Sequence, residues 1–339
     1  MKELKLYDIN LALFDNTNKT TDTTATTGND LSGEMKTFYS DYLIDLAEPE
    51  LVHDQFGQKH PIPKNGGKTI EFRKYDSLPK LTTPLEEGVT PQGQKLNMGV
   101  ITATVEQFGG YIELSDTLLL TAIDNNLVEA TKLLASQAGR TLDTITREVL
   151  AGGTNVQYAE RAYDDSMTRD QLTADDKITV RAIRLAVRAL KVMNAPKING
   201  DYVGIIHPDC EYDIMDDPDW KYPHQYVDTD NIYSNEIGKV AGVRFVETTE
   251  AKIWNDDTTP ADTAVYSTLI LGANAYGVTE ITGGGLQHIV KQLGSSGTAD
   301  PLNQRATAGW KAYKVAERLV EQYMVRIETT STFGNVAAN

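Results

Sequence analysis

Residues 64–69 of this sequence, Lys-Asn-Gly-Gly-Lys-Thr, end like a phosphate-binding loop. The full pattern requires a glycine five positions before Gly67, where this chain has Ile62. The residues that follow alternate in the manner of a strand, so no helix N-terminus would face a bound phosphate. The sequence therefore argues against nucleotide binding at this segment.

Metal or thiol chemistry could involve His207 and Cys210, which lie close together in the chain. None of the histidines belongs to a His-Glu-x-x-His motif, and no second local pair completes a metal site beside these two residues. A lone cysteine also cannot form an internal disulfide. We interpret the pair as a turn-forming His-Pro sequence beside a structural thiol, and we predict no metal, no cofactor and no catalytic residue.

Adjacent carboxylates could support acid–base or calcium chemistry, and they occur at Glu86-Glu87, Asp164-Asp165, Asp175-Asp176, Asp216-Asp217 and Asp256-Asp257. None has the alternating acids followed by glycine that a calcium loop requires. A catalytic acid–base pair must converge in space, which sequence spacing does not reveal. A carboxylate-dependent hydrolase or lyase acting through residues 197–290 therefore stays open as an alternative function.

A basic stripe is predicted on one helix, where four cations follow one another at spacings of three and four: Arg181, Arg184, Arg188 and Lys191. In one interpretation this is a solvated helix face that pairs with local acids. In the other, the stripe meets acidic loops of a neighbouring copy or a nucleic acid. Glu86 and Glu87, at the centre of a loop rich in proline and glycine, are the leading acidic candidates for such an assembly contact.

The composition limits the classes of partner. The chain has 339 residues, a net charge of −16 and a single cysteine. An acidic surface repels phosphate, so we expect only weak contact with DNA. No apolar run approaches the roughly 18–20 residues of a membrane span, and the single thiol is typical of a protein that folds in a reducing cytoplasm.

The elements that must position these residues can be predicted in order. Residues 1–30 form an arm whose Thr- and Asn-rich part cannot bury enough apolar area to order alone. Periodicity predicts helices over 31–48, 116–151 and 173–194, the second ending at Gly152-Gly153 and the third beginning with a capping pair, Thr173 and Asp176. A long hairpin is expected over 68–114, with its loop at 77–99. Short strands follow within 197–290 and again from Trp310 to Thr330.

Several long motifs resemble the major capsid protein family of phages related to coliphage N-four. They are residues 42–49 (Tyr-Leu-Ile-Asp-Leu-Ala-Glu-Pro), 51–58 (Leu-Val-His-Asp-Gln-Phe-Gly-Gln), 62–73 (Ile-Pro-Lys-Asn-Gly-Gly-Lys-Thr-Ile-Glu-Phe-Arg), 84–91 (Pro-Leu-Glu-Glu-Gly-Val-Thr-Pro) and 137–143 (Gln-Ala-Gly-Arg-Thr-Leu-Asp). The resemblance extends from about residue 28 to about residue 335. It implies an α+β fold of the Hong Kong ninety-seven type, with an N-terminal arm (1–67), an extended hairpin loop (68–115), a peripheral domain with a long spine helix (116–196 and 291–339) and an axial α/β domain (197–290).

The same resemblance implies a structural role instead of an enzymatic one. Copies of the chain would assemble as hexamers and pentamers into the icosahedral head of a tailed bacteriophage, around its double-stranded DNA, in the cytoplasm of the host. A portal protein, and scaffolding or decoration proteins, would be further partners, with no membrane involved. The shell of a bacterial nanocompartment, which has a similar fold but encloses enzymes, is the alternative within the same structural class.

Overall fold

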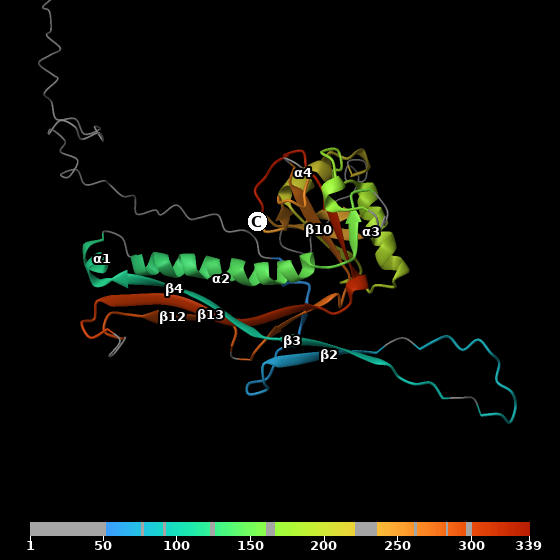
Figure 1. Cartoon of the computed structure of the whole chain (residues 1–339), viewed down its shortest axis with the longest axis horizontal. Helices are drawn as coiled ribbons and strands as arrows, with labels where there is room; N and C mark the ends of the chain where they lie inside the picture. Colours follow the sequence, from blue (N-terminus) through green and yellow to red (C-terminus); the bar gives the residue numbers. More distant parts are fainter. Residues whose placement is uncertain are drawn as a thin grey trace, which may run out of the picture. The chain divides into compact units, whose positions relative to one another are not determined.

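The computed structural model describes residues 52–75, 78–90, 93–122, 126–160, 167–220, 236–260, 263–282, 284–295 and 300–339 (Figure 1). All of them belong to one compact unit, residues 48–339. The predicted arm up to residue 30 and the predicted helix 31–48 lie outside the described residues. Within the described part of the chain, no helix is both long and apolar enough to cross a membrane.

A five-stranded sheet is built around β13 (Arg305–Arg318). One side of β13 pairs antiparallel with β4 (Glu106–Ser115). Its other side pairs with β12 (Gln287–Lys291) and then with β11 (Tyr276–Glu280), and β1 (Gln58–Lys59) runs parallel to β11. Four alternate side chains of β13 are buried on one face: Ala306, Ala308, Trp310 and Ala312. Three of them are alanine, which allows a helix to approach that face closely.

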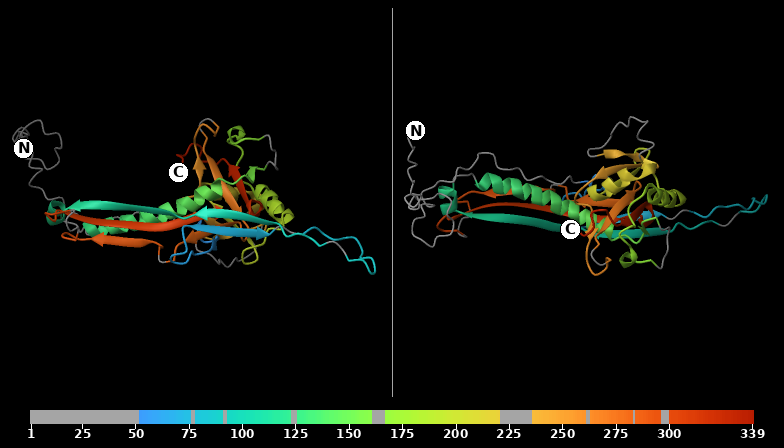
Figure 2. Two further views of the ribbon diagram at one scale, coloured as in Figure 1. Left: turned by 60° about the horizontal axis from the view of Figure 1, so that its bottom comes forward. Right: turned by 90° about the horizontal axis from the view of Figure 1, so that it is seen from above.

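That helix is α2 (Asn126–Ala151), which lies along the sheet in Figures 1 and 2. Leu134 and Ala138 pack against the alanines of β13, and the indole N–H of Trp310 donates to Gln137 Oε1 at 3.2 Å. The predicted end at Gly152-Gly153 is confirmed. Two arginines cap this end: Arg318 Nη1 donates to Val149 O at 2.6 Å and Arg326 Nη1 to Gly153 O at 2.9 Å.

The prediction of one helix over 116–151 was wrong, because two helices occupy this stretch. The first, α1 (Asp116–Thr121), begins at Ser115, whose Oγ accepts the Leu118 N–H at 3.2 Å, and it ends at Ala122 in extended conformation. The sequence then has Asp124, Asn125 and Asn126, residues that form helix poorly. At 1.5 Å per residue α2 is about 39 Å long.

The hairpin is shorter than predicted. Only β2 (Thr69–Tyr75) and β3 (Met98–Thr104) pair with each other, and the Val105 N–H closes their base by donating to Lys68 O at 2.8 Å. The continuation, β4, leaves the hairpin to pair with β13. The reason is visible at Gly109, where an added Cβ would lie 2.7 Å from Trp310 O, so the glycine permits the close approach of β13.

A seven-stranded mixed sheet forms the second layer of the unit. The order along its main path is β5 (Val156–Tyr158), β14 (Met324–Thr329), β10 (Val265–Leu271), β6 (Tyr202–Ile206), β8 (Val243–Glu247) and β7 (Glu236–Val240), with β9 (Ile253–Trp254) paired to β10. Every residue of β6, β10 and β14 is buried. The strands predicted at 203–206, 243–246 and 269–271 are confirmed, as is β-structure through most of 310–330.

Helices α3 (Val180–Val192) and α4 (Pro208–Asp216) cover one face of this sheet. The opposite face packs on Leu150 of α2 and on Tyr276 of β11, which joins the two sheets through a shared core. The sheets do not follow the predicted domain limits, because β5 and β14 come from outside 197–290 while β11 and β12 belong to the other sheet. The domain limits themselves stay a prediction.

The predicted start of the third helix was wrong. Helix α3 begins at Val180 after its cap Thr179, whose Oγ1 accepts the Ala182 N–H at 3.2 Å. Thr173 and Asp176 do bond to each other, with Asp176 Oδ2 accepting from both the N–H and the hydroxyl of Thr173 at 2.8 Å, but they form a turn. The chain cannot continue as helix from there because Lys177 bridges to Thr330 in extended conformation. The predicted buried stripe of Ile183, Val187 and Leu190 is confirmed.

Candidate assembly surfaces

His207 and Cys210 both serve the structure of α4. The His207 ring caps the helix, its Nδ1 accepting the Asp209 N–H at 3.1 Å, and burial lowers the pKa of His207. Asp209 also accepts the hydroxyl of Tyr266 at 2.6 Å. Burial raises the pKa of the Cys210 thiol, which therefore stays protonated and is a poor nucleophile or metal ligand. Among the described residues no group of three or more His, Cys, Asp or Glu is arranged to hold a metal.

Three of the adjacent carboxylate pairs stabilise local backbone. Asp176 closes the turn at Thr173, Asp217 Oδ2 accepts the Val180 N–H at 2.9 Å at the start of α3, and Asp256 Oδ1 accepts the Thr258 N–H at 2.8 Å. Asp164-Asp165 lies outside the described residues. Each of the three acids thus has a structural hydrogen bond that requires no substrate.

A carboxyl pair that sequence reasoning missed joins Glu211 of α4 to Glu247 at the end of β8. Burial, together with the hydrogen bond and the charge of Glu247, raises the pKa of Glu211 to about 8. The Glu211 carboxyl therefore stays largely protonated at neutral pH, because burial and the charge and hydrogen bond of Glu247 disfavour its ionised form. The two residues are far apart in sequence, and only the contact of α4 with β8 brings them together.

The hairpin loop between β2 and β3 exposes apolar side chains. Every described residue from 78 to 100 is exposed, and Leu81, Leu85 and Leu96 are 79%, 77% and 72% exposed. Figures 1 and 2 show this loop extending away from both sheets. Several large apolar side chains exposed on one loop indicate a surface that another molecule covers.

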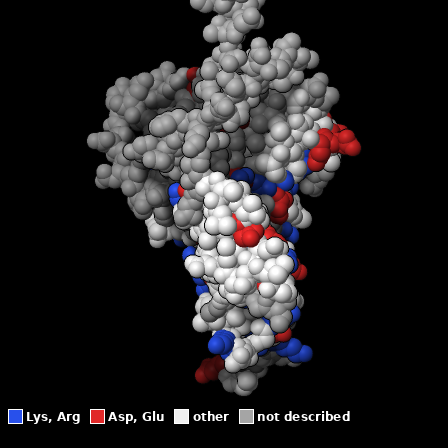
Figure 3. All heavy atoms as spheres, turned by 90° about the vertical axis from the view of Figure 1, so that its left-hand side faces the viewer, with Lys and Arg blue, Asp and Glu red and all other residues white. Residues whose placement is uncertain are grey.

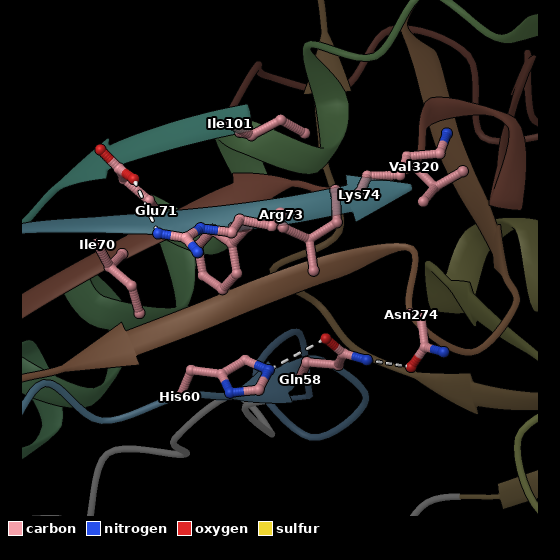
Figure 4. A pocket seen from close by; sticks show the side chains of 11 residues that line it. Gln58, His60, Ile70, Glu71, Arg73, Lys74, Ile101, Asn274 and Val320 are labelled. Carbon is pink, nitrogen blue, oxygen red and sulfur yellow. Dashed lines mark hydrogen bonds and ion pairs between the residues drawn. The ribbon is translucent and has the colours of Figure 1, made fainter. Parts of the chain in front are cut away.

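A hollow of about 390 Å³ lies where the hairpin meets the sheets, and Figure 4 shows it from nearby. Phe72 connects the two parts: its ring is edge-on to His60, with centroids 5.7 Å apart, and a Cβ at Gly277 would lie 3.2 Å from it. Below the hairpin, Gln58 links His60 to Asn274 through hydrogen bonds. Phe72 therefore provides an aromatic contact between the hairpin and its base, beside a partly open space.

The predicted basic stripe on α3 is exposed along its whole length. Arg181 is 3.5 Å from Glu160 and Arg184 is 3.0 Å from Asp219, so pairing with local acids accounts for these two. No ion pair to Arg188 or Lys191 is found among the described residues. No contact within the described chain joins the stripe to Glu86 or Glu87, and a contact between copies stays a prediction.

A third surface lies at the α1 end of the five-stranded sheet. The Asp116 N–H donates to Gln304 O at 2.9 Å, which holds α1 beside the segment that leads into β13. Leu118, Leu120 and Leu302 are exposed there. Figure 3 faces this end and shows residues without charge over most of the described surface, with Lys and Arg mainly at its margins. This surface is also suited to contact with another protein.

Comparison with known proteins gives one family and many related structures. A family model described as phage capsid protein matches residues 99–325. The capsid of cyanophage Pam1 is 10% identical, covers 90% of this chain and 99% of its own, and superposes with a TM-score of 0.68. The capsid of Ralstonia phage GP4 (13% identity, 94% and 100% coverage, TM-score 0.67) and that of cyanophage P-SCSP1u (12%, 89% and 94%, 0.66) are similar in fold. No curated protein sequence matches the chain.

Proposed function

The chain belongs to the phage capsid protein family, and on this premise we propose that many copies of it assemble into the icosahedral head of a tailed phage, around the double-stranded DNA genome. It is a major capsid protein with the Hong Kong ninety-seven type of fold, a structural subunit and not an enzyme. The kinship with phages related to coliphage N-four stays a prediction.

The observation that carries this proposal is the exposed hairpin loop. Between residues 78 and 100 the chain presents leucines to solvent without burying any described residue of its own. A loop of this length without secondary structure or a core is unusual in a compact domain unless it contacts a partner. In a shell made of one protein, the abundant partner is another copy of the same chain.

The proposed arrangement uses several contacts per subunit. Hexamers and pentamers built from one sequence require elements that tolerate small changes of angle, and a hairpin held at its base by Phe72 has this property. Closed symmetry then lets many modest contacts hold a stable shell. The arm (1–67), the loop (68–115) and the two domain surfaces would each contribute. Portal, scaffolding and decoration proteins would be further partners, and assembly would take place in the cytoplasm of the bacterial host.

Electron microscopy and sedimentation velocity of the purified full chain test this proposal. We expect closed shells or capsomer rings, with nucleic acid instead of enzyme cargo inside particles taken from infected cells. The triple variant Leu81→Ser, Leu85→Ser, Leu96→Ser should assemble poorly, whereas the matched triple Met variant keeps the apolar area and should assemble. A chain that is monomeric under all ionic conditions and absent from virions contradicts the proposal.

A further inference from the structure

The C-terminal half of α3 borders a hollow of about 530 Å³ that combines positive charge with apolar surface. Its lining consists of three cations and three apolar residues: Arg184, Arg188, Lys191, Val187, Val192 and Ala241. Ala241 belongs to the turn between β7 and β8, so the hollow is built from two separate elements. Val192 is 61% exposed, which leaves an apolar rim beside the charges.

The charges of this hollow are only partly used within the chain. Arg184 is paired with Asp219, but Arg188 and Lys191 have no ion pair among the described residues. The C-terminal end of a helix favours a cation, which accounts for Lys191 in part. It does not account for a second cation one turn earlier or for the apolar rim. In a chain with 48 acidic and 32 basic residues, two neighbouring cations that have no ion pair within the described part of the chain are suited to an acidic partner.

The tip of the hairpin loop has the complementary chemistry. Glu86 and Glu87 are flanked by Leu85, which is 77% exposed, and by Val89, which is 57% exposed. The Val89 N–H donates to Glu86 O at 3.2 Å and Gly88 has a φ of +81°, as a type II turn requires at its third position. The tip is therefore a defined turn that presents two carboxylates and two apolar side chains together, which lowers the entropy cost of docking.

We infer that the turn at Glu86 and Glu87 of one copy docks in the basic hollow on α3 of a neighbouring copy. This inference rests on the proposed function, because it requires copies in contact. Each copy has one such turn and one such hollow, so the contact is head-to-tail and forms a ring when the rotation between copies closes. The apolar residues on both sides favour a protein occupant over DNA, whose phosphates would use the cations alone.

Paired charge reversals test the electrostatic part. Glu86→Lys with Glu87→Lys, or Arg188→Glu with Lys191→Glu, should each lower the association constant about tenfold or more, with a larger loss at low salt because screening is weaker there. Combining all four changes restores opposite charges and should recover most of the association. The controls Asp170→Lys with Asp175→Lys, and Lys64→Glu with Lys68→Glu, change the net charge equally at exposed positions elsewhere and should assemble normally.

Cross-linking between copies tests the contact directly. In the variant Glu87→Cys with Lys191→Cys, diamide should form disulfides between copies and give a ladder up to complete rings, since the native Cys210 is buried. The variant Glu87→Cys with Lys64→Cys should not cross-link. If the wild type forms shells but the variant Glu87→Cys with Lys191→Cys forms no disulfide between copies, the contact is wrong and the proposed function stands. Normal assembly of both charge-reversal variants would have the same meaning. If reversing the α3 charges changes only the amount of nucleic acid inside the particles and leaves assembly normal, the hollow is a nucleic-acid surface and the inference fails. A wild-type chain that stays monomeric overturns the proposed function and this contact together.

Discussion

The side chains of His53 and Asp143 meet at 2.6 Å between Nδ1 and Oδ2, although the two residues are 90 positions apart in the sequence. Asp143 Oδ1 also accepts the backbone N–H of His53 at 2.9 Å, and both residues are buried. The neighbouring Asp54 accepts the hydroxyl of Thr146 at 2.5 Å and pairs with the buried Lys314 of β13. The start of the described chain is therefore fixed to α2 and to the central strand at the same place.

Replacing Asp143 with alanine should unfold this anchor. The substitution removes both acceptors and leaves the buried His53 ring and N–H without them, so the free energy of unfolding should fall by about 3–5 kcal/mol. Urea unfolding of unassembled subunits measures the loss. Asp175→Ala, at an exposed carboxylate, should stay within about 0.5 kcal/mol of the wild type. Equal effects of the two substitutions would contradict the importance of the buried pair.

Replacing Phe72 with alanine should loosen the hairpin and leave the second sheet intact. The change removes the ring contact with His60 and the close approach of the Phe72 ring to Gly277 of β11, which connect the hairpin to the five-stranded sheet. Hydrogen exchange should accelerate in residues 69–75 and 98–104 and remain unchanged in β6 and β10. Phe333→Ala, at an exposed phenylalanine, is the control. Uniform acceleration across both sheets would show that Phe72 stabilises the whole unit instead.

Gly204 should not tolerate a methyl group. A Cβ at this position of β6 would lie 2.5 Å from Cε1 of the buried Phe245. Gly204→Ala should therefore cost about 1–3 kcal/mol of unfolding free energy through overpacking. At Gly93, in the hairpin loop, an added Cβ meets nothing within 4 Å, so Gly93→Ala should be nearly neutral. Thermal unfolding of the two alanine variants side by side measures the difference, and similar midpoints would refute it.

The Glu211 carboxyl should make the stability depend on pH. Burial and Glu247 raise the pKa of Glu211 from its ordinary value of 4.5 to about 8. A carboxyl whose pKa is raised by folding stabilises the folded state only while it is protonated. The contribution of Glu211 to the free energy of unfolding is therefore complete below pH 4.5 and is lost as the pH rises toward 8. Glu211→Gln should therefore reduce the fall in unfolding free energy between pH 5 and pH 8. Glu211 is partly exposed, so the effect should be smaller than for a fully buried acid.

Comparing Glu211→Gln with the wild type separates the contribution of Glu211 to the pH dependence of stability from that of His207, which has the opposite sign. Burial lowers the pKa of His207 below the ordinary value of 6.5, so its contribution to stability increases as the pH rises from the lowered pKa to 6.5 and is complete above 6.5. Asp175→Asn is the control for removing a carboxylate. An identical pH profile for Glu211→Gln and wild type would show that the pKa of Glu211 is not raised in the folded chain.

Local patterns in the sequence predicted most of the elements. The buried stripe of Ile183, Val187 and Leu190 follows from helical spacing alone, and Gly152-Gly153 marks the end of α2 because glycine disfavours helix. The exposure of all four cations on α3 was also predictable, since they lie opposite that stripe. These features depend on residues within a few positions of one another.

Long-range choices were not predictable from these patterns. The alternation of segment 106–115 predicts a strand but not its partner, and the glycines of β4 and β13 that permit their close approach are recognised only once the two strands are paired. Thr173 and Thr179 are both residue types that cap helices. The bridge from Lys177 to Thr330 keeps the chain extended between them, so Thr179 is the residue that caps α3. The His53–Asp143 pair gave no sequence signal at all. Contacts between copies were not predictable either, because they depend on surfaces that only the folded chain defines.

The pairing partners of β13 and β14 have a consequence for synthesis. Each of these strands pairs with one strand that is made much earlier: β4 and β5 must wait for residues 305–329 to leave the ribosome. Pairing of such distant segments is slow, because the chain must first close a long loop. A nascent subunit thus lacks both finished sheets until residues 305–329 have been made. Surfaces that depend on these sheets cannot join a shell before that point.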